Sequence, residues 1–301
     1  MAESLMSDPI ILSLLKDLSL KVCKPYAQMP QTKAILSIGS VSYGIVDESS
    51  DIDMALYYDE LPSDQELHDA MVSNGAAQLN WRIGNREDGG LIDSYMVYGV
   101  ECQFAHTTLT AMKRDMDSIL VGFEVASPFQ KALSGVLAGA PIVGEALINE
   151  YKARAATYPA GLRKAMVEHF MNFQPLWAIE DRMSVRDAEL WRMQALVDGS
   201  YNLLGVLAGL NRLYYSSFQF KRMGAFIDQM EVKPNDLCRR ITLVFKGKPT
   251  AATVFRELVA ETVELVEKVM PEVNTSVVHS RLNRSVHRWN AEVLATALAR
   301  D

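Results

Sequence analysis

Apolar and polar positions follow different periods in the two halves of the chain. Between Ala34 and Thr107, short apolar runs and period-two alternation prevail, which is typical of β-strands. From Thr108 onward, apolar residues recur mainly three and four positions apart, which indicates amphipathic helices. The pattern therefore predicts an α+β fold: a small mixed β-sheet flanked by helices, followed by an all-α helical bundle.

The first half of the chain is predicted to contain four strands and four helices. Tyr98-Gly99 is expected to split the last strand into a hairpin, and Thr108 is expected to cap the helix that follows it. The expected strands are 34–38, 51–56, 78–83 and 93–107, and the expected helices are 9–29, 63–73, 108–120 and 128–137.

A segment with three glycines and a proline, 134–145, is taken as the domain junction. This gives an N-terminal domain at residues 1–140 and a helical domain at 141–301. The longest periodic run, 187–215, places Leu190 and Leu204 on its buried side. Its glycines, Gly199, Gly205 and Gly209, are expected to allow close helix packing. Further helices are expected at 160–173, 218–230, 234–243, 251–270 and 277–299.

Composition narrows the classes of function. The 301 residues suffice for two domains, and the net charge of −7 argues against a general nucleic-acid binder. Cys23, Cys102 and Cys238 form neither a disulfide framework nor a metal-ligand pair, which favours a reducing cytoplasm. Because no signal peptide or long apolar run is evident, a soluble cytoplasmic protein without membrane partners is expected. The sequence predicts no oligomeric state.

The candidate chemistry is concentrated in residues 34–58. An apolar strand breaks at Gly39-Ser40, and a turn-rich segment with Gly44 leads to Asp51 and Asp53 on the next strand. On a strand the two carboxylates share one face, where they repel unless a cation lies between them. Mg²⁺ favours carboxylates together with phosphate oxygens. The pattern therefore predicts a divalent metal site.

The spacing of Gly39-Ser40, Gly44 and Ser50-Asp51-x-Asp53 resembles the signature of the nucleotidyltransferase superfamily that includes DNA polymerase β. Within it, the chain looks most like the bacterial small-molecule and aminoglycoside nucleotidyltransferases. The resemblance implies two Mg²⁺ ions, or Mn²⁺ in their place, held by three carboxylates. Asp51 and Asp53 would be two of them, and Glu101 is the candidate for the third, with Asp93 as the alternative.

The resemblance also implies roles for the other candidate residues. Gly39 would let the backbone approach the phosphates, Ser40 would donate to them, and Ser50 would brace the turn before Asp51 or contact the nucleotide. In the helical half, Glu168 is the first candidate for a general base and Asp198 the second. Lys221 is a candidate triphosphate contact.

The function implied is metal-dependent transfer of a nucleotidyl group. It would be adenylyl transfer from ATP, or transfer from another nucleoside triphosphate, to a hydroxyl of a small molecule such as an antibiotic, releasing pyrophosphate. The helical domain would close the cleft and contribute to acceptor binding. Three alternatives stay open: a toxin-like enzyme acting on protein or RNA, a catalytically inert nucleotide-binding module, and a kinase.

Overall fold

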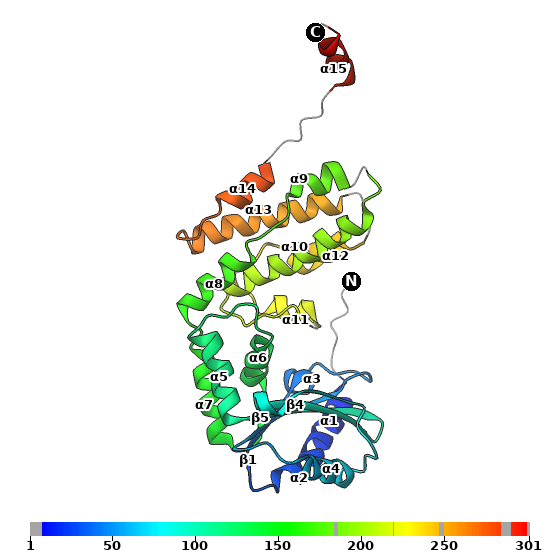
Figure 1. Cartoon of the computed structure of the whole chain (residues 1–301), viewed down its shortest axis with the longest axis vertical. Helices are drawn as coiled ribbons and strands as arrows, with labels where there is room; N and C mark the ends of the chain where they lie inside the picture. The colour runs from blue at the N-terminus through cyan, green and yellow to red at the C-terminus, as the bar shows by residue number, and fades with distance from the viewer. Residues whose placement is uncertain (1–7, 184–185, 219, 247–249, 284–289, 300–301) are drawn as a thin grey trace. The chain divides into compact units, whose positions relative to one another are not determined.

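A computed structural model describes the chain at residues 8–183, 186–218, 220–246, 250–283 and 290–299 (Figure 1). The chain divides into two compact units, Met1–Pro159 and Ala160–Asp301. This division lies later than the expected boundary after residue 140. The reason is that strand β6 (Ala140–Val143) pairs with β1 (Thr32–Ile38), and helix α7 (Glu145–Ala156) also packs on β1.

The first unit is built on one mixed sheet with the strand order β3-β4-β5-β2-β1-β6. β2 and β5 run parallel, and the other neighbouring pairs of the described sheet run antiparallel. β1 and β6 have the bounds stated above, and the other four strands are β2 (Ile52–Tyr58), β3 (Trp81–Asn85), β4 (Gly90–Val97) and β5 (Val100–Thr108). The helices are α1 (Pro9–Val22), α2 (Lys24–Ala27), α3 (Gly39–Tyr43), α4 (Asp64–Ser73), α5 (Leu109–Leu120), α6 (Phe129–Ala138) and α7, with a 3₁₀ turn, η1 (Arg86–Asp88).

Local sequence signals set several of these boundaries. Ser63 and Glu66 form a reciprocal capping box at the start of α4, and the Thr108 hydroxyl accepts a hydrogen bond from the Ala111 amide at the start of α5. Tyr98 and Gly99 both have positive φ, as a tight β4–β5 hairpin turn requires. The predicted hairpin and the predicted Thr108 cap are therefore confirmed.

The two faces of the sheet are covered by different helices (Figure 1). On one face, the hydroxyl groups of Tyr26 of α2 and Tyr95 of β4 form a hydrogen bond with each other. The side-chain amide of Asn74, which follows α4, donates a hydrogen bond to the same Tyr95 hydroxyl. On the other face, Tyr57 of β2 packs edge-on against Tyr151 of α7. We call the first the tyrosine face and the second the aspartate face, because Asp53 shares the second face with Tyr57 through the period of two along β2.

The tyrosine face contains a buried ionic cluster. The Arg82 guanidinium donates to both oxygens of the buried Asp93 carboxylate, at 2.5 and 2.8 Å. His106 is fully buried, and its Nδ1 lies 3.0 Å from the Tyr58 hydroxyl. Its Nε2 lies 3.8 Å from Asp93, a distance at which a charged imidazole would form an ion pair. Burial outweighs this attraction and lowers the pKa of His106 to about 4, so the imidazole is neutral at pH 7.

The regular elements among the described residues of the second unit are all helices. It contains α8 (Ala160–Phe170), α9 (Leu176–Ala178), η2 (Ile179–Met183), α10 (Glu189–Leu210), α11 (Met223–Asp228), α12 (Leu237–Val244), α13 (Ala251–Val269), α14 (Ser276–Asn283) and α15 (Ala291–Leu298). With the mixed sheet, this confirms the expected α+β class. None of the described helices has both the length and the apolar character that a membrane span requires.

Helix α10 is the centre of this unit and packs against α8 and α13. A Cβ on Gly205 would lie 2.3 Å from the Phe170 ring of α8, and one on Gly199 would lie 2.5 Å from the Phe255 ring of α13. The predicted close packing at these glycines is confirmed. The prediction for Leu190 is wrong: its side chain is 89% exposed, because it lies in the first turn of α10, ahead of the buried segment.

Candidate functional site

The candidate site begins where β1 turns into α3. Ile38 is paired with Asp53 across the antiparallel β1–β2 ladder, so the next residue, Gly39, lies beside Asp53. Gly39 has a φ of +67°, and a Cβ added there would lie 2.0 Å from the Asp53 Oδ2. Only glycine fits both the backbone conformation and the contact. The Gly-Ser pair is therefore placed directly against the aspartate strand.

The two serines of the signature have different surroundings. The Ser40 Oγ is buried and has no hydrogen-bond partner within the described structure. The Ser50 hydroxyl accepts a hydrogen bond from the Asp47 amide at 2.9 Å and donates to the Asp47 carboxylate at 3.2 Å. Ser50 therefore braces its own turn, whereas Ser40 has a donor available for a ligand.

A residue that sequence reasoning did not select, Gln103, lies beside Asp51 and Asp53 on the aspartate face. Gln103 of β5 is paired with Asp53 across the parallel β2–β5 ladder. Its Nε2 donates to the Asp51 Oδ2 at 3.1 Å. The amide therefore contacts Asp51, and Gln103 stands beside Asp53 on the neighbouring strand. The alternation of Glu101 and Gln103 with buried Cys102 and Phe104 was the signal that pointed to this face.

Glu101 shares the aspartate face with Gln103, but its carboxylate is turned along this face toward β4 and β3. Its Oε1 accepts hydrogen bonds from the Trp81 Nε1 of β3 at 3.0 Å and from the Ser94 Oγ of β4 at 2.5 Å. Both partners lie across β4 and β3, away from β2. The structure therefore places Glu101 on the expected face and engages it with neighbours other than Asp51 and Asp53.

Asp93, the alternative third carboxylate, lies on the opposite face. It is paired with Phe104, and Phe104 alternates with Gln103 along β5. Its carboxylate is buried on the tyrosine face with Arg82. A strand separates it from Asp51 and Asp53, so it is not positioned to share a ligand with them.

The donors at the site fit one divalent cation better than two. Asp51 and Asp53 supply two carboxylates on one face, the missing Cβ of Gly39 admits the Asp53 carboxylate, and the Ser40 hydroxyl is unpaired. Among the described residues, no three acidic, histidine or cysteine side chains are grouped to hold a metal. Cys102 adds no ligand, since burial, with a smaller contribution from the Glu101 carboxylate, raises the pKa of its thiol to about 12.

Three of the sequence-predicted residues belong to the second unit: Glu168, Asp198 and Lys221. Glu168 of α8 lies 3.7 Å from Lys164 one helical turn earlier, with both side chains about half exposed. Lys221 is exposed and precedes α11. Their roles as base and triphosphate contact stay predictions.

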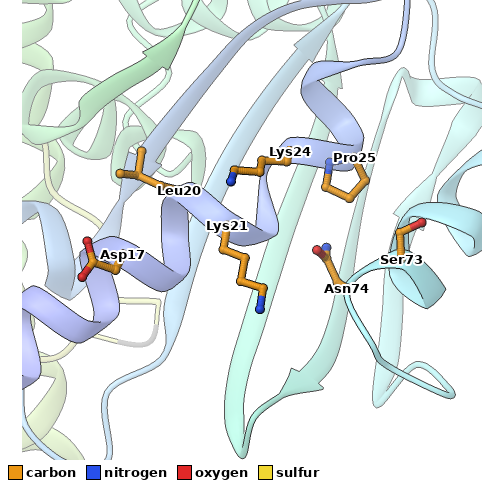
Figure 2. Close-up of a pocket in the computed structure, with 7 residues that line it drawn as sticks. All are labelled: Asp17, Leu20, Lys21, Lys24, Pro25, Ser73 and Asn74. Atoms are coloured by element: carbon orange, nitrogen blue, oxygen red, sulfur yellow. The ribbon is translucent and has the colours of Figure 1, made fainter.

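Two cavities of the first unit lie on the tyrosine face rather than beside the aspartates. The larger, about 320 Å³, lies between α1, α2 and the end of α4. Figure 2 shows Lys21 and Lys24 at its edge and Asn74 at its far side. The smaller, about 150 Å³, is lined by residues that include Arg82 and Asp93. Neither cavity is lined by Asp51 or Asp53.

No protein-family model matches the sequence, and no curated protein matches it. Comparison with solved structures finds a nucleotidyltransferase-like protein from Exiguobacterium sibiricum 255-15, with a TM-score of 0.41 and 10% sequence identity. The match covers 92% of this chain and 83% of that chain. A likeness at this level does not identify a function.

Proposed function

We propose that the protein is a nucleotidyltransferase that transfers a nucleotidyl group from a nucleoside triphosphate, ATP in the first instance, to a hydroxyl of a small molecule. The observation that carries the proposal is the close contact between Gly39 and Asp53, with Asp51 on the same strand face. It brings the Gly39-Ser40 turn against a pair of carboxylates, which is the arrangement that the sequence signature implies.

The chain's own groups would act as follows. Asp51 and Asp53 would hold a divalent cation, Mg²⁺ or Mn²⁺, which when bound neutralises charge on the triphosphate. The Ser40 hydroxyl would donate to a phosphate oxygen, because it is buried and unpaired. Gly39, which has no Cβ, would let the Asp53 carboxylate lie close to the start of α3, beside the phosphates. Together these groups would orient the α-phosphorus for attack by the acceptor oxygen, with pyrophosphate as leaving group.

The test is transfer of label from ATP carrying it at the α- or the γ-phosphate, assayed against a panel of hydroxyl-bearing acceptors. Label transferred from the α position, and lost in Asp51→Asn and Asp53→Asn, supports nucleotidyl transfer. The expected loss is at least about a hundredfold, since each variant removes a cation ligand. Transfer from the γ position would indicate a kinase, and unchanged turnover in either variant would overturn the assignment of the site.

One observation favours a second candidate function, a nucleotide-binding module without turnover. The described residues group only two carboxylates at the site, with the Gln103 amide beside them. Metal-dependent nucleotide binding that is lost in Asp51→Asn, without transfer of either label to any acceptor, would support the module over the enzyme.

A further inference from the structure

Gln103 is the feature of the site that the resemblance does not explain. The parallel ladder pairs Ile52 with Cys102 and Asp53 with Gln103, so the side chains of Asp53 and Gln103 lie side by side on the aspartate face. Asp51 lies one pleat earlier on the same face, and its Oδ2 accepts the Gln103 amide hydrogen at 3.1 Å. Gln103 therefore contacts one aspartate while it stands next to the other.

The neighbouring acidic groups do not supply the charge that Gln103 lacks. The Glu101 carboxylate is held by Trp81 and Ser94, and Asp93 is buried on the opposite face with Arg82. Glu101 is thus engaged with β3 and β4, and the carboxylates beside Gln103 on β2 are those of Asp51 and Asp53. One Mg²⁺ is commonly held by one or two carboxylates plus substrate phosphates. A second ion would need a further carboxylate, which the site does not present.

We infer that this site binds one divalent cation per nucleotide, and that Gln103 determines this number. This inference rests on the proposed function. Gln103 occupies the position where a carboxylate would bind a second ion, and its amide holds Asp51 through the hydrogen bond. A single-atom exchange, amide nitrogen to oxygen, would turn this position into a third carboxylate without changing its size.

The experiment counts ions and nucleotides bound at equilibrium. The full chain is dialysed against radioactive Mn²⁺ and labelled ATP with a methylene group between its α- and β-phosphates, which blocks transfer. The ratio of bound Mn²⁺ to bound nucleotide is measured for the wild type, Gln103→Glu, Asp51→Asn and Gln28→Glu. Gln28 is exposed at the end of α2 on the tyrosine face, so Gln28→Glu makes the same change in charge away from the site.

The expected ratios are one ion per nucleotide in the wild type and in Gln28→Glu, and two in Gln103→Glu. Asp51→Asn should lose metal-dependent binding. Two ions per nucleotide in the wild type would overturn the inference and leave the proposed function standing. One ion in both wild type and Gln103→Glu would overturn the role given to Gln103. Metal-dependent binding that Asp51→Asn leaves intact would instead overturn the proposed function.

Discussion

At the scale of single residues, Gly39 is the most constrained position in the candidate site. An alanine there would meet two penalties, a positive φ that costs about 1–2 kcal/mol and an overlap with the Asp53 carboxylate. We expect Gly39→Ala to displace Asp53, to abolish metal-dependent nucleotide binding and to lower the free energy of unfolding by more than the backbone cost. Calorimetric titration and urea unfolding measure the two effects.

Gly75 provides a matched control for this variant. It has a φ of +83°, and a Cβ added there meets no atom within 4 Å. Gly75→Ala should therefore carry the backbone cost alone and bind nucleotide normally. If both variants bound nucleotide equally well, the contact between Gly39 and Asp53 would not be needed for nucleotide binding.

His106 gives the protein a pH dependence that belongs to its fold. Its pKa is about 4 in the folded chain, against 6.5 ordinarily, because burial disfavours the charged form. As the pH falls below 6.5, the imidazole is protonated in the unfolded chain before it is protonated in the folded one. The free energy of unfolding therefore falls by about 3 kcal/mol by pH 4.

Urea unfolding of the wild type and His106→Asn, from neutral pH to about pH 4, measures this effect. The free energy of unfolding of the wild type should fall relative to that of His106→Asn by about 3 kcal/mol over this range, because only the wild type carries the imidazole. A difference that stays constant with pH would contradict the assignment to His106.

Among single residues, sequence reasoning selected the candidates whose signal is local. Gly39, Ser40, Asp51 and Asp53 lie within 15 positions of one another and are recognisable by spacing. Gln103 was missed because its contact with Asp51 depends on which strands become neighbours, and no pattern within either strand encodes that pairing.

At the scale of secondary-structure elements, the packing of α10 on α8 depends on glycine. A Cβ on Gly205 would lie 2.3 Å from the Phe170 ring, so Gly205→Ala should destabilise the fold by about 1–3 kcal/mol. This outcome opposes helix propensity, which favours alanine over glycine by about 1 kcal/mol. Thermal unfolding followed by circular dichroism measures the change.

The control here is Gly224 of α11, where an added Cβ would meet the Cys238 Sγ at an ordinary 3.7 Å. Gly224→Ala should leave the melting temperature unchanged or raise it slightly. A higher melting temperature for Gly205→Ala would mean that α8 can move away from α10 without cost. It would contradict the destabilisation expected from their close packing.

Element types were predictable where periodicity was long or caps were clear, as for α4, α5 and the β4–β5 hairpin. Strand β6 was missed because its four residues lie in a segment rich in glycine and proline, whose composition is typical of a linker. It becomes a strand by pairing with the edge of β1, which is a tertiary effect.

At the scale of the whole molecule, this missed strand decides where the first unit ends. A fragment of residues 1–159 keeps all six strands and α7, and we expect it to unfold cooperatively and to elute as a compact species. A fragment of residues 1–140 loses the pairing of β6 with β1 and the contact between Tyr151 and Tyr57. It should aggregate, because an unpaired sheet edge and an apolar face become exposed.

Size-exclusion chromatography and thermal unfolding of the two fragments compare them directly. The comparison tests whether the first unit ends after residue 140, as composition predicts, or after Pro159, as in the structure. Equal stability of the two fragments would show that β6 and α7 contribute nothing to the first unit.

The parallel pairing of β2 with β5 also bears on when the site can form during synthesis. Asp53 precedes its partner Gln103 by 50 residues, and two strands between them must be made first. At about 5–20 residues per second, Gln103 is added to the nascent chain roughly 3–10 seconds after Asp53. During that interval the two aspartates leave the ribosome on a strand that still lacks one neighbour, so a stalled or truncated chain carries the recognisable motif without an assembled site.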